Sequence, residues 1–126
     1  AAADEAVAAR GKAAAAELGD DVAARVAAHV EDAVRAVVDA GPERRVDTRF
    51  GTLRLEEYLR TRTFELVVHG LDLARAVGAP TDVVPRDGVG AALQLAAETV
   101  TASGRGPDVL LALTGRTPLP PGFSLL

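Results

Sequence analysis

Valines recur at helical spacing between residues 20 and 41. Asp20 or Asp21 can act as the N-cap of this segment, and Gly41-Pro42 stops it. The spacing predicts an amphipathic helix with one apolar stripe, formed by Val22, Val26, Val30, Val34, Val37 and Val38.

Four other segments are also predicted to be helical. Residues 4–18 are rich in Ala and end at Gly19, which suits a left-handed cap. The segment from Leu55 to Val77 is the longest and ends at Gly78 with Pro80 beyond it. Shorter helices are expected over residues 87–101 and over residues 108–114, where Pro107 suits a first helical position.

The remaining segments do not have a helical pattern. Residues 43–54 are charged, β-branched and interrupted by Gly51, which predicts an irregular connection with a short strand-like piece from Val46 to Phe50. The proline-containing stretch 116–126 is predicted to be an extended arm lying on the helices. We therefore expect an all-α fold, a bundle of about four helices, in a single domain over residues 1–126.

The composition limits which kinds of partner and which cellular compartment we expect for this protein. Three Phe, one Tyr and no Trp leave a thin core of Ala, Val and Leu. The net charge of −4, with no basic cluster, makes nucleic acid an unexpected partner. Asp4 and Glu5 do not suit a signal peptide, and no uncharged apolar stretch approaches the roughly 18 residues that span a bilayer, so a soluble, cytoplasmic protein is expected. Because the chain has no Cys, any thiol chemistry needs a thiol from a cosubstrate.

Glu65, His69 and Asp72 follow each other at steps of four and three residues, so they share one face of the predicted helix 55–77. A carboxylate and an imidazole at this spacing can bind one metal ion, with Asp72 orienting the imidazole. The same spacing also suits a simple surface pair of Glu65 and His69, with Asp72 paired to Arg75 or Arg62 or capping a neighbouring loop.

Two segments resemble a known family. Residues 57–74, EYLRTRTFELVVHGLDLA, look like the signature helix of the mycothiol-dependent maleylpyruvate isomerases, which are DinB/YfiT-like metal-binding helical bundles. Residues 112–116, ALTGR, and 119–123, LPPGF, are similar to the C-terminal end of many actinobacterial members. The resemblance extends more loosely through Phe50-Gly51 and the helix before it, over about the last hundred residues.

The resemblance implies a divalent metal ion, commonly zinc, held by Glu65, His69 and a further His from an early helix. The early His, expected near a Trp-containing segment, is missing, which suggests the C-terminal portion of a longer protein, incomplete at its N-terminus, or a shortened member. His29 is the other histidine of the chain, and its place at the edge of the valine stripe favours a structural role over a ligand role.

By the same resemblance, mycothiol is the thiol cosubstrate, and it adds to a small electrophile such as maleylpyruvate. Arg60, Arg62 and Arg116 are candidate anchors for a substrate carboxylate, or form surface ion pairs. The alternatives are metal-dependent hydrolysis by water and a non-enzymatic binding or dimerisation module without a complete metal site. In a half-bundle, the valine stripe would favour a homodimer.

Overall fold

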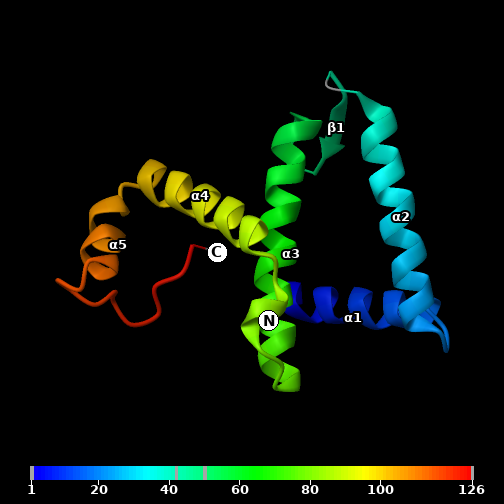
Figure 1. The fold of residues 1–126 in the computed structure, drawn as a ribbon, viewed down its shortest axis with the longest axis horizontal. Coiled ribbons are helices and arrows are strands. Elements are labelled where there is room, and N and C mark those ends of the chain that lie inside the picture. Colours follow the sequence, from blue (N-terminus) through cyan, green and yellow to red (C-terminus); the bar gives the residue numbers. More distant parts are fainter. Residues whose placement is uncertain (1, 42, 50, 126) are drawn as a thin grey trace. The chain divides into compact units, whose positions relative to one another are not determined.

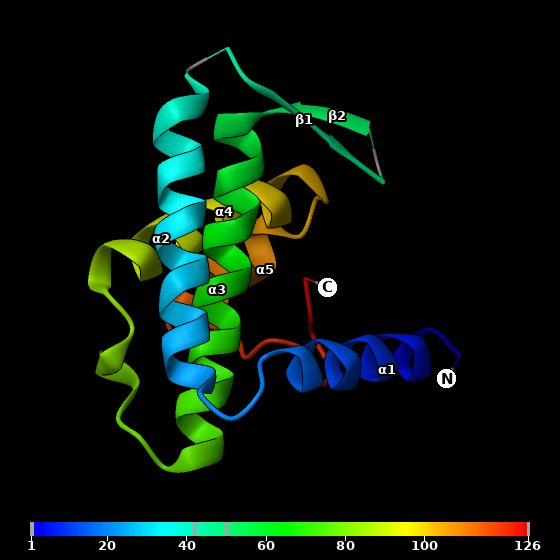
Figure 2. The ribbon, with the colours of Figure 1, turned by 90° about the vertical axis from the view of Figure 1, so that its right-hand side faces the viewer.

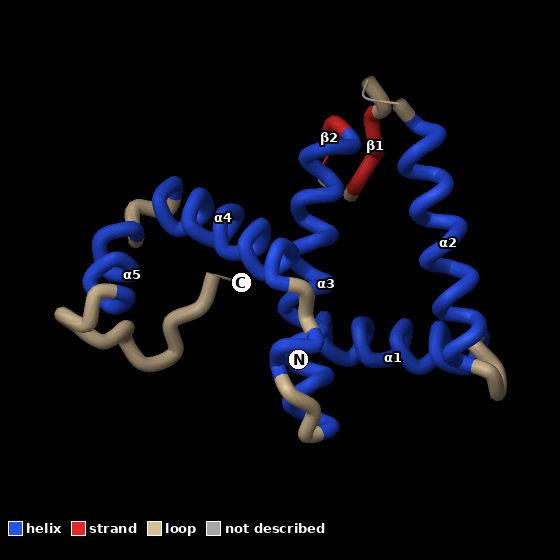
Figure 3. Tube along the Cα trace, viewed as in Figure 1, coloured by secondary structure: helices blue, strands red, loops and turns tan. Residues whose placement is uncertain are grey.

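The computed structural model describes residues 2–41, 43–49 and 51–125, which form five α-helices, one 3-10 helix and one two-stranded sheet (Figures 1 and 3). The predicted all-α class is confirmed, with a small hairpin added. The chain divides into two compact units, Ala1–Arg44 and Arg45–Leu126. A single domain over residues 1–126 stays a prediction.

The first unit contains two helices, α1 (Ala2–Glu17) and α2 (Val22–Ala40). Gly19, with φ of 66°, provides the left-handed turn between them, as its sequence context predicts. Asp21 caps α2, because its carboxylate accepts a hydrogen bond from the Ala24 amide at 3.1 Å. The valine stripe of α2 is exposed, and none of the described residues of α2 is buried.

The second unit opens with an antiparallel hairpin of β1 (Arg45–Thr48) and β2 (Gly51–Arg54), in which Thr48 is paired with Gly51. The strand-like piece expected from Val46 onward is therefore present, although Phe50 lies outside the described residues. The second strand was not predicted, since Gly51 read as an interruption. Its φ of 122° instead lets it open β2 directly after the turn, a conformation that L-residues rarely adopt.

The hairpin leads directly into α3 (Leu55–Val77), which has the bounds predicted for it and ends at the left-handed Gly78. Both strands contact α3, and the hairpin extends sideways from the N-terminal end of this helix (Figure 2). The 3-10 helix η1 (Thr81–Val83) and then α4 (Arg86–Ala102) follow, and both pack on α3.

The core of the second unit is thin, as the low aromatic content predicts. α3 and α4 lie in contact where Gly88 faces Val67: a Cβ atom at Gly88 would lie 3.4 Å from Cγ2 of Val67. The buried apolar residues of the described chain are Val67, Ala74, Ala92 and Val100.

The last helix, α5 (Gly106–Leu113), starts two residues earlier than predicted and has Pro107 in its first turn. The tail beyond it returns toward the helices. The Arg105 side chain, just before α5, donates a hydrogen bond to the Ser124 carbonyl at 2.9 Å and stacks on the Phe123 ring at 3.9 Å. No helix in the described ranges combines the length and apolar character needed to cross a bilayer.

Candidate functional site

The face of α3 that carries Glu65, His69 and Asp72 is formed as the sequence predicts. His69 lies between the two carboxylates: its Nε2 is 3.3 Å from Glu65 Oε2, and its Nδ1 is 3.9 Å from Asp72 Oδ2. The His69 side chain is 74% exposed, whereas that of Glu65 is 40% exposed. The imidazole is thus open to solvent, and the Glu65 carboxylate is partly enclosed.

The geometry of Glu65 and His69 fits a shared metal ion. Two ligand atoms that each lie 2.0–2.2 Å from a tetrahedral zinc ion are about 3.3–3.5 Å apart. The 3.3 Å separation of Oε2 and Nε2 falls in this range. An imidazole–carboxylate pair without a metal has a similar separation, so the distance is compatible with both interpretations.

Asp72 lies next to Nδ1, on the other side of the ring from Nε2. It is therefore not placed to share an ion that is bound between Nε2 and Glu65. The 3.9 Å between Nδ1 and Asp72 Oδ2 is an ion-pair distance and is longer than a hydrogen bond. Among the residues that the structure describes, no group of three His, Cys, Asp or Glu side chains is close enough to bind one ion. His29 lies exposed on α2, in the other unit.

Glu65 borders two cavities in the second unit. One, of about 220 Å³, lies between α3, α4 and the tail and is mostly apolar. The other, of about 490 Å³, lies between the hairpin and α3. This second cavity, called here the hairpin cavity, is lined by Thr48, Arg49, Leu53, Tyr58, Thr61, Arg62 and Glu65.

A further cavity, of about 530 Å³, lies on a different face of α3 and continues toward η1 and the start of α4. Leu66, Gly70 and Leu73 are among its lining residues, and neither Glu65 nor His69 is. The described residues that line it include no ionisable side chain, so its size alone does not make it the site.

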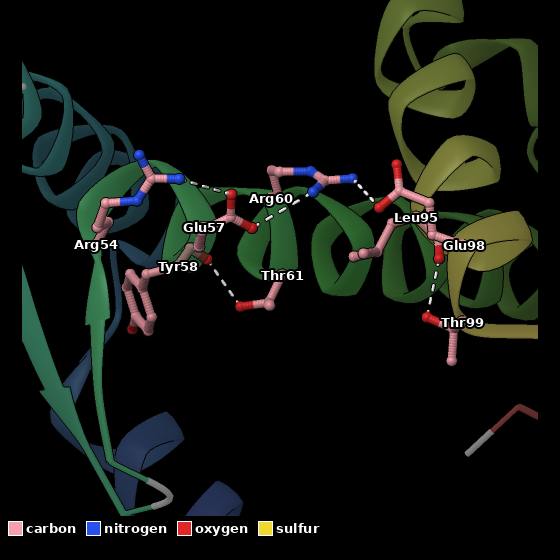
Figure 4. A network of polar contacts seen from close by, with 8 residues as sticks. All are labelled: Arg54, Glu57, Tyr58, Arg60, Thr61, Leu95, Glu98 and Thr99. Carbon is pink, nitrogen blue, oxygen red and sulfur yellow. Dashed lines mark hydrogen bonds and ion pairs between the residues drawn. The ribbon is translucent and has the colours of Figure 1, made fainter. Parts of the chain in front are cut away.

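The structure separates the three arginines that the sequence offered as anchors. Arg60 is engaged in ion pairs with Glu57 on α3 and with Glu98 on α4, as Figure 4 shows. The hydrogen bond from Arg60 holds the pKa of Glu98 below its usual range, and the same bond raises the pKa of Arg60. Arg116 donates to the Thr114 carbonyl at 2.8 Å. Of the three, Arg62 lines the hairpin cavity.

Tyr58, Thr61 and Arg49 are site residues that the sequence reasoning missed. Tyr58 and Thr61 were detectable, because they precede Glu65 at seven and four positions and so share its side of the helix. Arg49 gave no such signal, since its place in the cavity depends on how the hairpin packs against α3.

A family model described as the mycothiol maleylpyruvate isomerase N-terminal domain matches residues 1–74. The matched segment includes Glu65, His69, Asp72 and the residues that line the hairpin cavity. The second resembling stretch, residues 112–123, lies outside the match. No curated protein and no solved structure gave a significant match.

Proposed function

Because the chain belongs to the mycothiol maleylpyruvate isomerase N-terminal domain family, we propose that it is a divalent-metal-dependent thiol transferase or isomerase that uses mycothiol. Its substrate would be a small electrophile that carries a carboxylate, such as maleylpyruvate. The observation that carries the proposal is the Glu65–His69 pair, which lies inside the matched segment and has the separation of two ligands of one ion.

In this proposal, each residue of the α3 face has a separate task. Glu65 and His69 hold the metal ion, probed first as zinc, and Asp72 fixes the ring orientation of His69. When bound, such an ion lowers the pKa of a thiol and polarises a carbonyl group. Since the chain has no Cys, the reacting sulfur comes from mycothiol. The reaction takes place in the cytoplasm, where thiols are kept reduced.

The hairpin cavity supports the proposal because it connects the partly enclosed Glu65 carboxylate to a space of suitable size. Ligand pockets for small molecules have volumes of roughly 300–1,000 Å³, and this cavity has about 490 Å³. A substrate in the cavity would thus lie next to one of the two proposed ligands.

The first experiment is a metal analysis by plasma mass spectrometry of chain purified without chelator or affinity tag. We expect about one zinc ion per chain, lost in both Glu65→Ala and His69→Ala. His29→Ala is the matched control for removal of an exposed histidine, and Glu56→Ala is the control for an exposed carboxylate on α3. Both controls should keep the metal. Loss of metal in the controls, or its absence from the unaltered chain, would contradict the proposal.

A second experiment tests the reaction itself. The zinc-loaded chain is incubated with mycothiol and maleylpyruvate, and the cis-to-trans change is followed by absorbance. We expect turnover that requires the thiol and is lost in His69→Ala. Turnover without any thiol would favour hydrolysis or another water-dependent reaction over thiol transfer.

One observation favours a different function, a non-enzymatic binding or dimerisation module. Within the described part of the chain, no third side chain joins Glu65 and His69 in a group that could hold one metal ion. In that case the valine stripe of α2 would pair with a second copy. A dimer in light scattering that becomes a monomer in Val30→Asp, together with absence of metal, would support this alternative.

A further inference from the structure

The hairpin cavity has a charge pattern that the metal proposal does not explain. Two of its lining residues are arginines, Arg49 from the hairpin turn and Arg62 from α3, and one is an acid, Glu65. Among the described lining residues the arginines outnumber the acid, in a chain whose net charge is −4. A metal ion on Glu65 would make the cavity more positive still.

The guanidinium group of Arg62 contacts two neighbours on its own helix. Its guanidinium carbon lies 5.2 Å from the centre of the Tyr58 ring, and its Nε donates to Thr61 Oγ1 at 3.2 Å. Tyr58, Thr61 and Arg62 all line the cavity. These contacts use the face and the inner edge of the guanidinium group, so its two terminal NH₂ groups remain for a planar acceptor.

Arg62 also lacks the carboxylate partners that occupy Arg60 two positions earlier. In the ranges that the structure describes, no Asp or Glu oxygen lies within ion-pair distance of Arg62, whereas Arg60 pairs with both Glu57 and Glu98. A guanidinium group fixed by an aromatic ring and facing a cavity is a suitable site for bidentate binding of a carboxylate.

We propose that Arg62 binds a carboxylate of a ligand in the hairpin cavity, whose lining also includes Arg49. The two arginines of the described lining suit a small dicarboxylate, of which one carboxylate pairs with Arg62. That this ligand is the substrate rests on the proposed function. The binding of the anion by Arg62 does not, because it requires neither the metal ion nor the thiol.

The test is a calorimetric or NMR titration with maleate, performed on chain stripped of metal with a chelator and again on zinc-loaded chain. We compare the unaltered chain with Arg62→Gln, Arg62→Lys and Arg75→Gln. Arg75 is the matched control, because it is an exposed arginine in the last turn of the same helix and does not line the hairpin cavity. Circular dichroism checks that each variant is folded.

We expect Arg62→Gln to weaken maleate binding roughly tenfold or more, since one bidentate charged pair is lost. Arg62→Lys should give an intermediate loss, because lysine keeps the charge without the fork. Arg75→Gln should bind like the unaltered chain, and the uncharged dimethyl maleate should not compete. Equal binding by Arg62→Gln, or an equal loss in Arg75→Gln, would overturn the proposal.

The two metal states separate this inference from the proposed function. Maleate binding that depends on Arg62 in a chain that never retains zinc would support the carboxylate site and remove the metal proposal. Zinc binding that is lost in Glu65→Ala and His69→Ala, together with maleate binding that is unchanged in Arg62→Gln, would support the metal proposal and remove the carboxylate site.

Discussion

Of the two long helices, α2 and α3, the one with the clearer apolar stripe in its sequence is the less buried in the structure. α2 has the clearer apolar stripe, yet none of its described residues is buried. α3 has the weaker periodicity, yet it contributes Val67 and Ala74 to the core and contacts the hairpin, η1 and α4. A hydrophobic pattern thus defines which face of a helix can be buried, and the burial itself depends on contacts with other segments.

The two histidines of the chain also differ, in the charged residues that lie next to them on their helices. His69 on α3 has carboxylates four positions before it and three positions after it, and both lie near its ring nitrogens. His29 on α2 has Arg25 at the first of these positions and Asp32 at the second. Asp32 pairs with Arg35 at 3.5 Å. His69 therefore has a carboxylate near each of its ring nitrogens, whereas the acid that follows His29 is paired with an arginine.

The largest expected effect concerns this contrast between the histidines. We expect Asp72→Ala to weaken zinc binding about 10–100-fold, because the His69 ring loses the acceptor that orients it. His29→Ala should leave the affinity unchanged. Competition with a chromogenic zinc chelator measures both. An equal loss in the two variants would show that the α3 face is not the site.

The next effect concerns burial. Val100 is 3% exposed and Val34 is 59% exposed. We expect Val100→Ala to lower the free energy of unfolding by about 2 kcal/mol, from lost burial and the space left behind. Val34→Ala should change it by less than about 0.5 kcal/mol. Urea unfolding measures both, and a comparable loss at Val34 would show that the α2 stripe is covered in solution.

A smaller effect distinguishes the starts of the two helices. The Asp21 carboxylate caps α2, whereas Arg54 at the start of α3 makes no side-chain cap. We expect Asp21→Ala to destabilise the first turn of α2 by about 1 kcal/mol. This loss of stability should be measurable as faster hydrogen exchange of the Ala24 amide. Arg54→Ala should leave exchange in the first turn of α3 nearly unchanged, and equal acceleration at both ends would contradict the assignment.

The smallest effect is the pH dependence of the Arg60–Glu98 pair, which joins α3 to α4. Because the pKa of Glu98 is lowered in the folded chain, the unfolded chain binds more protons in the acid range. The contribution of the pair is therefore complete above the usual range for Glu and declines as the pH falls through the lowered pKa.

We expect Glu98→Gln to be slightly less stable than the unaltered chain at neutral pH, with the difference vanishing in acid. Thermal unfolding across the acid range measures it. Asp32→Asn on α2 is the control, because its exposed partner Arg35 lies on the same helix and the pair joins no other element. A difference for Glu98→Gln that persists unchanged into acid would show another origin.

Part of the candidate site could be predicted because its residues are neighbours on one helix. The bounds of α3 follow from its pattern and from Gly78, and the grouping of Glu65, His69 and Asp72 follows from the pitch of the helix. The cavity next to Glu65 could not be predicted in this way. It requires the hairpin, whose second strand begins at a glycine that looked like a break.

The sequence by itself determined the helical class, most helix ends and the order of side chains on each helix face. These properties depend on residues within about one turn of each other. The tertiary structure decided which valines are buried. It also decided that Arg60 forms ion pairs and that Arg62 lines the hairpin cavity. Arg60 pairs with Glu98, 38 positions away. Such a contact depends on how α3 and α4 pack, and local spacing carries no information about it.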